Sequence, residues 1–192
     1  MVWMRILTAA MLVIAFVPAL FLLPAVWWNT LCVVLVAACA WEWAALSSMR
    51  KTGCLIFTAA IAILGTGFLL PYSGREWCFI AGTIFWALAV PVLLWHKPVE
   101  VTSLGRLAMG GIVLVPAFLS LVELRQNSPA LLLAVLAIAW VSDSSAYFTG
   151  RAFGRHKLAP AISPGKTWEG LYGGLAAVVA YALVALVLFE RL

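Results

Sequence analysis

Residues 6–41, ILTAAMLVIAFVPALFLLPAVWWNTLCVVLVAACAW, contain no charged side chain. The run is too long for a single transmembrane helix, because about 20 apolar residues suffice to cross the hydrocarbon core of a bilayer. Pro24 interrupts helical hydrogen bonding, and the tryptophans that follow it favour the membrane interface. The run therefore predicts two spans joined by a tight turn, at about residues 6–23 and 27–46.

Apolar runs bounded by charged residues follow the same pattern through the rest of the chain. They predict further spans at about residues 54–70, 77–95, 107–122, 130–147 and 171–189. Of the 192 residues, 66% are hydrophobic and only 10% are charged, whereas soluble domains carry about 25% charged residues. We therefore predict an all-α polytopic integral membrane protein with about seven transmembrane helices. It is expected to form a single transmembrane domain over residues 1–192.

The distribution of Lys and Arg predicts the orientation of these helices, since basic residues prefer the cytoplasmic side. With seven spans, one side of the membrane carries Arg5, Arg50, Lys51, Lys97, Arg106, Arg151, Arg155, Lys157 and Lys166, and the other carries Arg75, Arg125 and Arg191. The side with more basic residues includes the N-terminus and a polar segment at residues 140–170. We expect that side to face the cytoplasm.

Charge and cysteine content narrow the range of partners. The chain has a net charge of +5, with its basic residues at the ends of apolar runs. This placement favours anionic lipid headgroups as partners and argues against nucleic acid. The cysteines form no C-x-x-C pair and have no histidine at metal-ligand spacing, so we predict free thiols and neither a zinc site nor a redox motif. They are Cys32, Cys39, Cys54 and Cys78.

Polar residues gather in one stretch, residues 140–170, WVSDSSAYFTGRAFGRHKLAPAISPGKTWEG. It contains Asp143, the only aspartate in the chain, in the C-terminal part of a predicted span. An ionised carboxylate at membrane depth costs roughly 2.5 to 3.5 kcal/mol on insertion scales, so such a residue usually has a cation, a proton or an aqueous cavity beside it. We therefore predict a functional role for Asp143. The alternative is a charge that simply reaches water at the end of the helix.

The loop after Asp143 predicts an anion-binding site. Its basic residues surround turn-forming prolines and a glycine before the next helix; they are Arg151, Arg155, His156, Lys157 and Lys166. Ser163 and Pro164 resemble the N-cap and first position of a helix, whose N-terminus would then lie beside Lys166 and attract anions. A basic cytoplasmic loop without a site would explain the charges equally well, but not the SPGKT arrangement at residues 163–167.

Two glycine patterns in this segment have different meanings. GKT at residues 165–167 invites comparison with a phosphate-binding P-loop, but that motif needs a glycine where the chain has Pro160, and a buried strand before it. We therefore exclude a P-loop. Gly170, Gly173 and Gly174 predict close packing of the last span against another helix, as small residues do in membranes.

The segment at residues 140–170 resembles the central motif of the bacterial phosphatidate cytidylyltransferases, also called CDP-diglyceride synthetases. AWEWAAL at residues 40–46 is similar to the second span of the same family. The resemblance implies a magnesium-dependent nucleotidyltransferase of phospholipid biosynthesis in the bacterial inner (cytoplasmic) membrane. Such an enzyme joins CTP and phosphatidate, a membrane lipid, to give CDP-diacylglycerol and pyrophosphate. The oligomeric state is left open, a homo-oligomer included.

The same resemblance implies roles for individual residues. Asp143 corresponds to a metal-binding acidic residue, and Ser163, Lys166 and Thr167 to an S-P-x-K-T element near the nucleotide phosphates. Asp143 and Lys166 are therefore the expected catalytic residues, with Asp143 as the Mg²⁺ ligand. The residues expected to bind substrate phosphates are Arg155, Lys157, Ser163, Lys166 and Thr167. The cations among them can neutralise crowded phosphates, and a metal ion can bridge these.

The C-terminal signature of the family, S-x-x-K-R, K-D and P-G-H-G-G-x-x-D-R-x-D, does not occur before the chain stops at Leu192. We therefore expect a truncated or shortened homologue in which the 192 residues alone do not convert CTP and phosphatidate. The alternative is a noncatalytic membrane scaffold or anionic-lipid-binding protein derived from this family. A small transporter or channel fits less well, because it would need charged or broken helices in several spans.

Overall fold

The computed structural model describes residues 2–69, 74–95, 101–160 and 163–189. The chain forms two compact units, Met1–Asn127 and Ser128–Leu192. The single transmembrane domain expected over residues 1–192 stays a prediction, because two compact units within one bilayer can still act as one domain.

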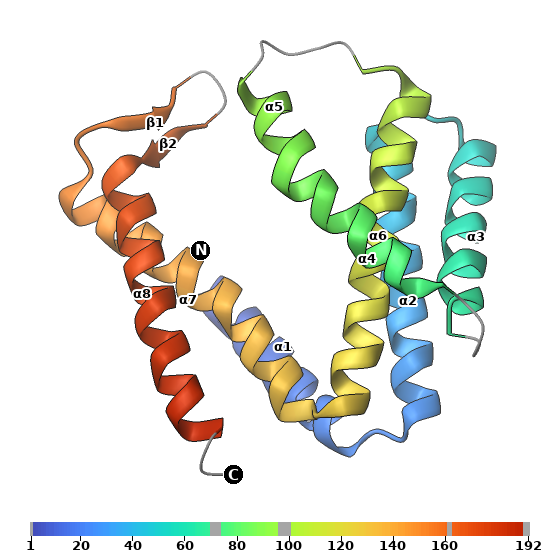
Figure 1. Ribbon diagram of the computed structural model, residues 1–192, viewed down its shortest axis with the longest axis horizontal. Coiled ribbons are helices and arrows are strands. Elements are labelled where there is room, and N and C mark those ends of the chain that lie inside the picture. Colours follow the sequence, from blue (N-terminus) through green and yellow to red (C-terminus); the bar gives the residue numbers. More distant parts are fainter. Residues whose placement is uncertain (1, 70–73, 96–100, 161–162, 190–192) are drawn as a thin grey trace. The chain divides into compact units, whose positions relative to one another are not determined.

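The first unit is a bundle of helices (Figure 1). Its elements are α1 (Val2–Leu22), α2 (Ala25–Leu46), α3 (Lys51–Gly67), α4 (Arg75–Ile84), the π-helical turn η1 (Phe85–Ala89), α5 (Val90–Trp95) and α6 (Ser103–Asn127). Helix α2 packs against both α3 and α6, and α6 also packs against α4. Buried side chains such as Ala40 of α2, Ile61 of α3 and Phe118 of α6 form the core of this unit.

The second unit is a pair of helices with a short hairpin (Figure 1). Its elements are α7 (Pro129–Phe153), β1 (Lys157–Ala159), β2 (Ser163–Thr167) and α8 (Trp168–Phe189). The hydroxyl of Ser128 caps α7 by accepting a hydrogen bond of 3.3 Å from the N–H of Leu131. Helices α7 and α8 pack along each other, and the hairpin joins them at one end.

The predicted spans correspond to the observed helices. Each predicted span corresponds to one helix, except that residues 77–95 follow the continuous series α4, η1 and α5. Residue 70, the last of the third predicted span, lies outside the described residues. In the described part of the chain, five helical segments are long and apolar enough to cross a membrane: Ala25–Leu46, Arg75–Leu93, Ser103–Asn127, Pro129–Phe153 and Trp168–Val187. Val13–Leu22, the C-terminal part of α1, and Lys51–Gly67, which is α3, are shorter apolar helical segments. The prediction of an all-α polytopic membrane protein with about seven spans is therefore confirmed.

The tight turn predicted at Pro24 is also confirmed. Helix α1 ends at Leu22, and α2 begins directly after Pro24. Arg125 of α6 holds this corner, because its guanidinium donates to the carbonyls of Leu20 (2.8 Å) and Leu23. The same guanidinium lies 4.9 Å from the ring centroid of Trp28, a cation–π contact. Arg125 thus satisfies carbonyls that the end of α1 leaves without helical partners.

The glycines of α8 pack against α7 as the sequence predicts. A Cβ atom on Gly173 would lie 2.5 Å from Cβ of Thr149, and one on Gly170 would lie 2.8 Å from the carbonyl oxygen of Ala146. Real side chains do not approach this closely, so only glycine allows the two backbones this separation.

The prediction of Ser163 as the N-cap of a helix is wrong. Residues Ser163–Thr167 form strand β2, which pairs antiparallel with β1 and places Lys157 opposite Thr167. The cap is Thr167, whose hydroxyl accepts a hydrogen bond of 3.2 Å from the N–H of Gly170. Pro164 alone does not distinguish a strand from the start of a helix, since its fixed φ suits a strand edge as well as a first helical turn. The anion-attracting end of the helix therefore begins four residues later than expected.

Candidate active site

The second unit contains a cleft of about 740 Å³ between α7, the hairpin and the start of α8. It is lined by Ser142, Asp143, Ala146, Tyr147, Gly150, Arg151, Leu158, Ser163, Gly165, Lys166, Thr167, Gly170 and Leu171. All of these residues except Leu171 come from the same polar stretch that the sequence singles out, residues 140–170.

Helix α7 supplies one wall of the cleft. Asp143, Tyr147 and Arg151 are spaced at intervals of four, so they lie along one face of the helix. The guanidinium Nη1 of Arg151 donates a hydrogen bond of 2.8 Å to the hydroxyl of Tyr147. Within the described part of the chain, the carboxylate of Asp143 has no hydrogen-bond or ion-pair partner, and its side chain is exposed. Asp143 is therefore available to a ligand or a metal ion.

The hairpin supplies another part of the lining. Lys166 is exposed in β2 and lines the cleft together with Ser163. Lys157, in β1, has its ammonium group tied across the hairpin, where Nζ donates to the carbonyl of Pro164 at 2.7 Å. Lys157 therefore stabilises the hairpin, while Lys166 faces the cleft.

A clamp fixes the base of the hairpin to the first turn of α8. The backbone N–H of His156 lies 3.3 Å from both carboxylate oxygens of Glu169, and its Nδ1 lies 2.7 Å from Oε1. The carbonyl of His156 also accepts a hydrogen bond of 3.0 Å from the N–H of Trp168. This clamp fixes the strand that carries Lys166 relative to α8.

The N-terminus of α8 opens onto the same cleft. Thr167 is buried, with 7% of its surface exposed, and caps the helix from inside the cleft wall. A Cβ atom on Gly150 would lie 2.9 Å from Oγ1 of Thr167, so glycine lets α7 approach the cap closely. The positive end of the α8 dipole thus lies beside Lys166, an arrangement that favours phosphate groups.

The predicted site residues divide into two groups. Asp143, Ser163, Lys166 and Thr167 line the cleft, and Arg155 and Lys157 do not belong to its lining. The roles assigned to all six stay predictions. Tyr147 lines the cleft although it was assigned no role from the sequence, and Arg151, one of the basic residues of the predicted anion-binding site, lines it as well. Their four-residue spacing from Asp143 is the signal that predicts their place on the same helix face.

The donor set suits a magnesium ion that is held partly by substrate. Among the described residues, no three His, Cys, Asp or Glu side chains lie close enough together to form a metal site by themselves. Mg²⁺ is, however, commonly bound by one or two carboxylates, several waters and the phosphates of a nucleotide. The exposed carboxylate of Asp143 in a cleft with Lys166 fits this mode of binding. The four cysteines are free, as predicted.

Comparisons with known proteins agree with these observations. The family model described as the cytidylyltransferase family matches residues 3–192. A phosphatidate cytidylyltransferase of Pseudomonas aeruginosa is 38% identical over 180 residues, which cover 90% of this chain and 66% of that protein. A phosphatidate cytidylyltransferase of Haemophilus influenzae is 30% identical over 211 aligned residues, with 94% of this chain and 71% of that protein covered.

A third relative is similar over a shorter part of the chain. A phosphatidate cytidylyltransferase of Brucella abortus is 33% identical over 147 residues, which cover 75% of this chain and 53% of that protein. No solved structure matches. The aligned part of the chain thus spans between about half and about 70% of these relatives. On the match over residues 3–192, the chain belongs to the cytidylyltransferase family.

Proposed function

We propose that the chain acts in phospholipid biosynthesis as a phosphatidate cytidylyltransferase, a transferase that converts CTP and phosphatidate to CDP-diacylglycerol and pyrophosphate. A phosphatidate oxygen attacks the α-phosphorus of CTP, the bond from that phosphorus to the β-phosphate oxygen breaks, and pyrophosphate leaves with the bonding electrons. The observation that supports this proposal most directly is one cleft lined by both Asp143 and Lys166. The names of three relatives agree with it.

Phosphate binding is the first requirement of this reaction, because several negative oxygens must come together at the reacting phosphorus. Lys166 offers an ammonium group in the cleft, and the N-terminus of α8 offers backbone N–H groups and a positive dipole end. Arg151 adds a guanidinium that Tyr147 orients. Ser163 contributes a hydroxyl, and Thr167 acts chiefly by capping α8.

Mg²⁺ is the proposed cofactor. Asp143 would hold it together with the phosphates of CTP, and the bound ion would neutralise charge on those phosphates. Asp143 and Lys166 line the same cleft and would thus act on the same phosphate groups.

The proposed orientation gives the cleft access to CTP, and the proposed compartment is the bacterial inner membrane. Exposed basic residues in and around the hairpin, including Arg155, Lys157 and Lys166, agree with a cytoplasmic position under the positive-inside rule. Phosphatidate would enter from the bilayer, since α7 and α8 are both apolar enough to span it.

Turnover is best tested in a full-length context. In the phosphatidate cytidylyltransferase of Pseudomonas aeruginosa, the segment that aligns with this chain is replaced by residues 1–192. Incorporation of radiolabelled CTP into lipid is then measured in liposomes with Mg²⁺ and phosphatidate. We expect activity from the chimera, and a loss of about 10²-fold on Lys166→Ala, the usual effect of removing one preorganised electrostatic contact to the transition state.

Lys51→Ala is the matched control, because Lys51 is an exposed lysine of the first unit. A chimera that inserts and folds but makes no labelled lipid would overturn the proposal. Equal activities of the Lys166 and Lys51 variants would show that Lys166 does not act in the reaction. Retained CTP binding without turnover would favour the noncatalytic alternative.

A further inference from the structure

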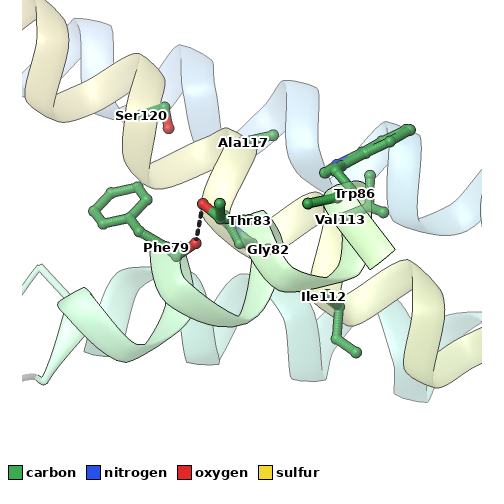
Figure 2. A pocket seen from close by; sticks show the side chains of 10 residues that line it. Phe79, Gly82, Thr83, Trp86, Ile112, Val113, Ala117 and Ser120 are labelled. Carbon is green, nitrogen blue, oxygen red and sulfur yellow. Dashed lines mark hydrogen bonds between the residues drawn. The ribbon is translucent and has the colours of Figure 1, made fainter. Parts of the chain in front are cut away.

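An open apolar groove of about 690 Å³ lies between α6 and the α4–η1 segment in the first unit (Figure 2). Its walls include Phe79, Trp86, Ile112 and Val113. The hydroxyl of Thr83 donates to the carbonyl of Phe79 at 2.8 Å, within its own helix. The groove therefore presents mainly hydrocarbon surface.

Small residues form the floor of the groove, and large ones flank it. A Cβ atom on Gly82 would lie 3.2 Å from Cγ of Pro116, so the two helices touch there. In Figure 2, the rings of Phe79 and Trp86 lie on either side of Thr83 along the groove. Trp86 belongs to the π-helical turn Phe85–Ala89, and Pro91 after it cannot donate the next helical hydrogen bond. The widened turn helps to hold the large ring at the wall of the groove.

One helical turn beyond the groove, the surface between the same two helices becomes polar. Arg75, Glu123, Gln126 and Asn127 line a notch of about 240 Å³ there. Nη1 of Arg75 lies 2.9 Å from Oε1 of Glu123, with 38% and 27% of the two side chains exposed. Both side chains are therefore partly exposed, although Oε1 of Glu123, the oxygen that faces Arg75, is buried.

The two charged residues of the notch lie near helix ends of opposite dipole sign. Arg75 begins α4, so it lies at the positive end of that helix dipole. Glu123 lies in the last turns of α6, toward the negative end of that dipole. Arg125, in the same part of α6, does not line the notch, and its guanidinium is bound to the carbonyls of Leu20 and Leu23. One side of the notch thus suits an anion and the other a cation.

The notch and the groove, together called the α4–α6 site, lie one after the other along the facing sides of the α4 segment and α6. Arg75, Phe79 and Trp86 recur on one face of the α4 segment, and Glu123, Ser120 and Pro116 recur on the facing side of α6. At ~1.5 Å rise per residue, roughly 16 Å separates Arg75 from Trp86. That length is about half of the ~30 Å hydrocarbon core, the depth that one acyl chain occupies.

We propose that this α4–α6 site binds one zwitterionic phospholipid with a primary amine in its headgroup, of the phosphatidylethanolamine type. Its phosphate lies at Arg75 and the start of α4, its ammonium group donates to Glu123, and one acyl chain fills the groove beside Phe79 and Trp86. The charge pattern favours this lipid over phosphatidylglycerol, which has no cation for Glu123. It also favours ethanolamine over choline, which has no N–H to donate.

The test uses the full chain in nanodiscs of phosphatidylethanolamine and phosphatidylglycerol, with a photoactivatable diazirine in an acyl chain of either lipid. Cross-linked peptides are mapped by mass spectrometry. We expect adducts from phosphatidylethanolamine on residues 79–87 and 112–120. Glu123→Gln should lower their yield about tenfold, the effect of losing a hydrogen bond to a charged group. Glu76→Gln, an exposed acid of α4 outside the notch, should not change it.

A second variant separates binding from folding. Ala117 lines the groove, so Ala117→Trp should block the acyl chain and abolish the adducts, while Ala108→Trp on the same helix, outside the groove, should keep them. Equal yields from the two lipids in every variant would overturn the proposal. An absence of lipid adducts on residues 79–87 of the unmodified chain would also overturn it, since something other than lipid would then cover the groove.

Discussion

The α7–α8 cleft and the α4–α6 site both lie where a glycine allows two helices to meet, but they differ in how their polar groups are distributed. In the cleft, Asp143, Tyr147 and Arg151 continue along one face of α7, and the hairpin adds Lys166. In the α4–α6 site the charged residues are confined to one end. Polarity along a whole helix face suits a ligand with several charges, such as a nucleoside triphosphate. Polarity at one end suits an amphipathic lipid.

Removal of the cleft carboxylate should produce the largest effect. Asp143→Asn keeps the size and polarity of the side chain but removes the charge that would hold Mg²⁺. In the chimeric enzyme, we expect labelled CTP incorporation to fall by about 10²-fold or more. Glu76→Gln removes a carboxylate from the first unit and should leave incorporation unchanged. Similar losses from both variants would mean that overall charge, and not the cleft, matters.

Disruption of the glycine contact in the second unit should have the next largest effect. Gly173→Ala would bring a Cβ atom within 2.5 Å of Cβ of Thr149, which no side-chain rotation can move. We expect a loss of about 1–3 kcal/mol in stability, typical of overpacking. Thermal unfolding in detergent measures it. Gly67→Ala is the control, because a Cβ atom there would meet nothing within 4 Å. Equal melting temperatures of the two variants would contradict the observed contact.

A smaller effect distinguishes the two arginines near the cleft. Arg151 lines the cleft and Arg155 does not. We therefore expect Arg151→Gln to raise the KM for CTP about tenfold in the chimera, the effect of one lost charge-assisted hydrogen bond. Arg155→Gln should raise it less. A larger effect at Arg155 would instead favour the assignment made from the sequence.

The helices follow from the sequence because each rests on a local signal. Apolar runs of suitable length define the spans, and Pro24 defines the turn between the first two. The contacts of Gly170 and Gly173 were also predictable, since small residues mark close helix packing in membranes. The sequence likewise indicated Asp143 and Lys166, which are the charged members of the cleft together with Arg151.

The features that the sequence did not predict depend on contacts between separate parts of the chain. Ser163 and Thr167 are both good caps, and only the pairing of β1 with β2 decides that Thr167 begins the helix. The clamp of His156 on Glu169 and the support of α1 by Arg125 likewise appear only once the chain has folded. The hydrogen bond from Lys157 to the carbonyl of Pro164 likewise forms only when the two strands of the hairpin pair.

The central claim is that the α7–α8 cleft binds the phosphates of CTP, and photo-cross-linking tests it most directly. The purified full chain in nanodiscs is irradiated with a γ-azidoanilide analogue of CTP in the presence of Mg²⁺, and the labelled peptides are identified. We predict adducts within residues 142–171, which excess CTP prevents and Lys166→Ala strongly reduces. Adducts confined to the first unit, or labelling that excess CTP leaves unchanged, would contradict the account.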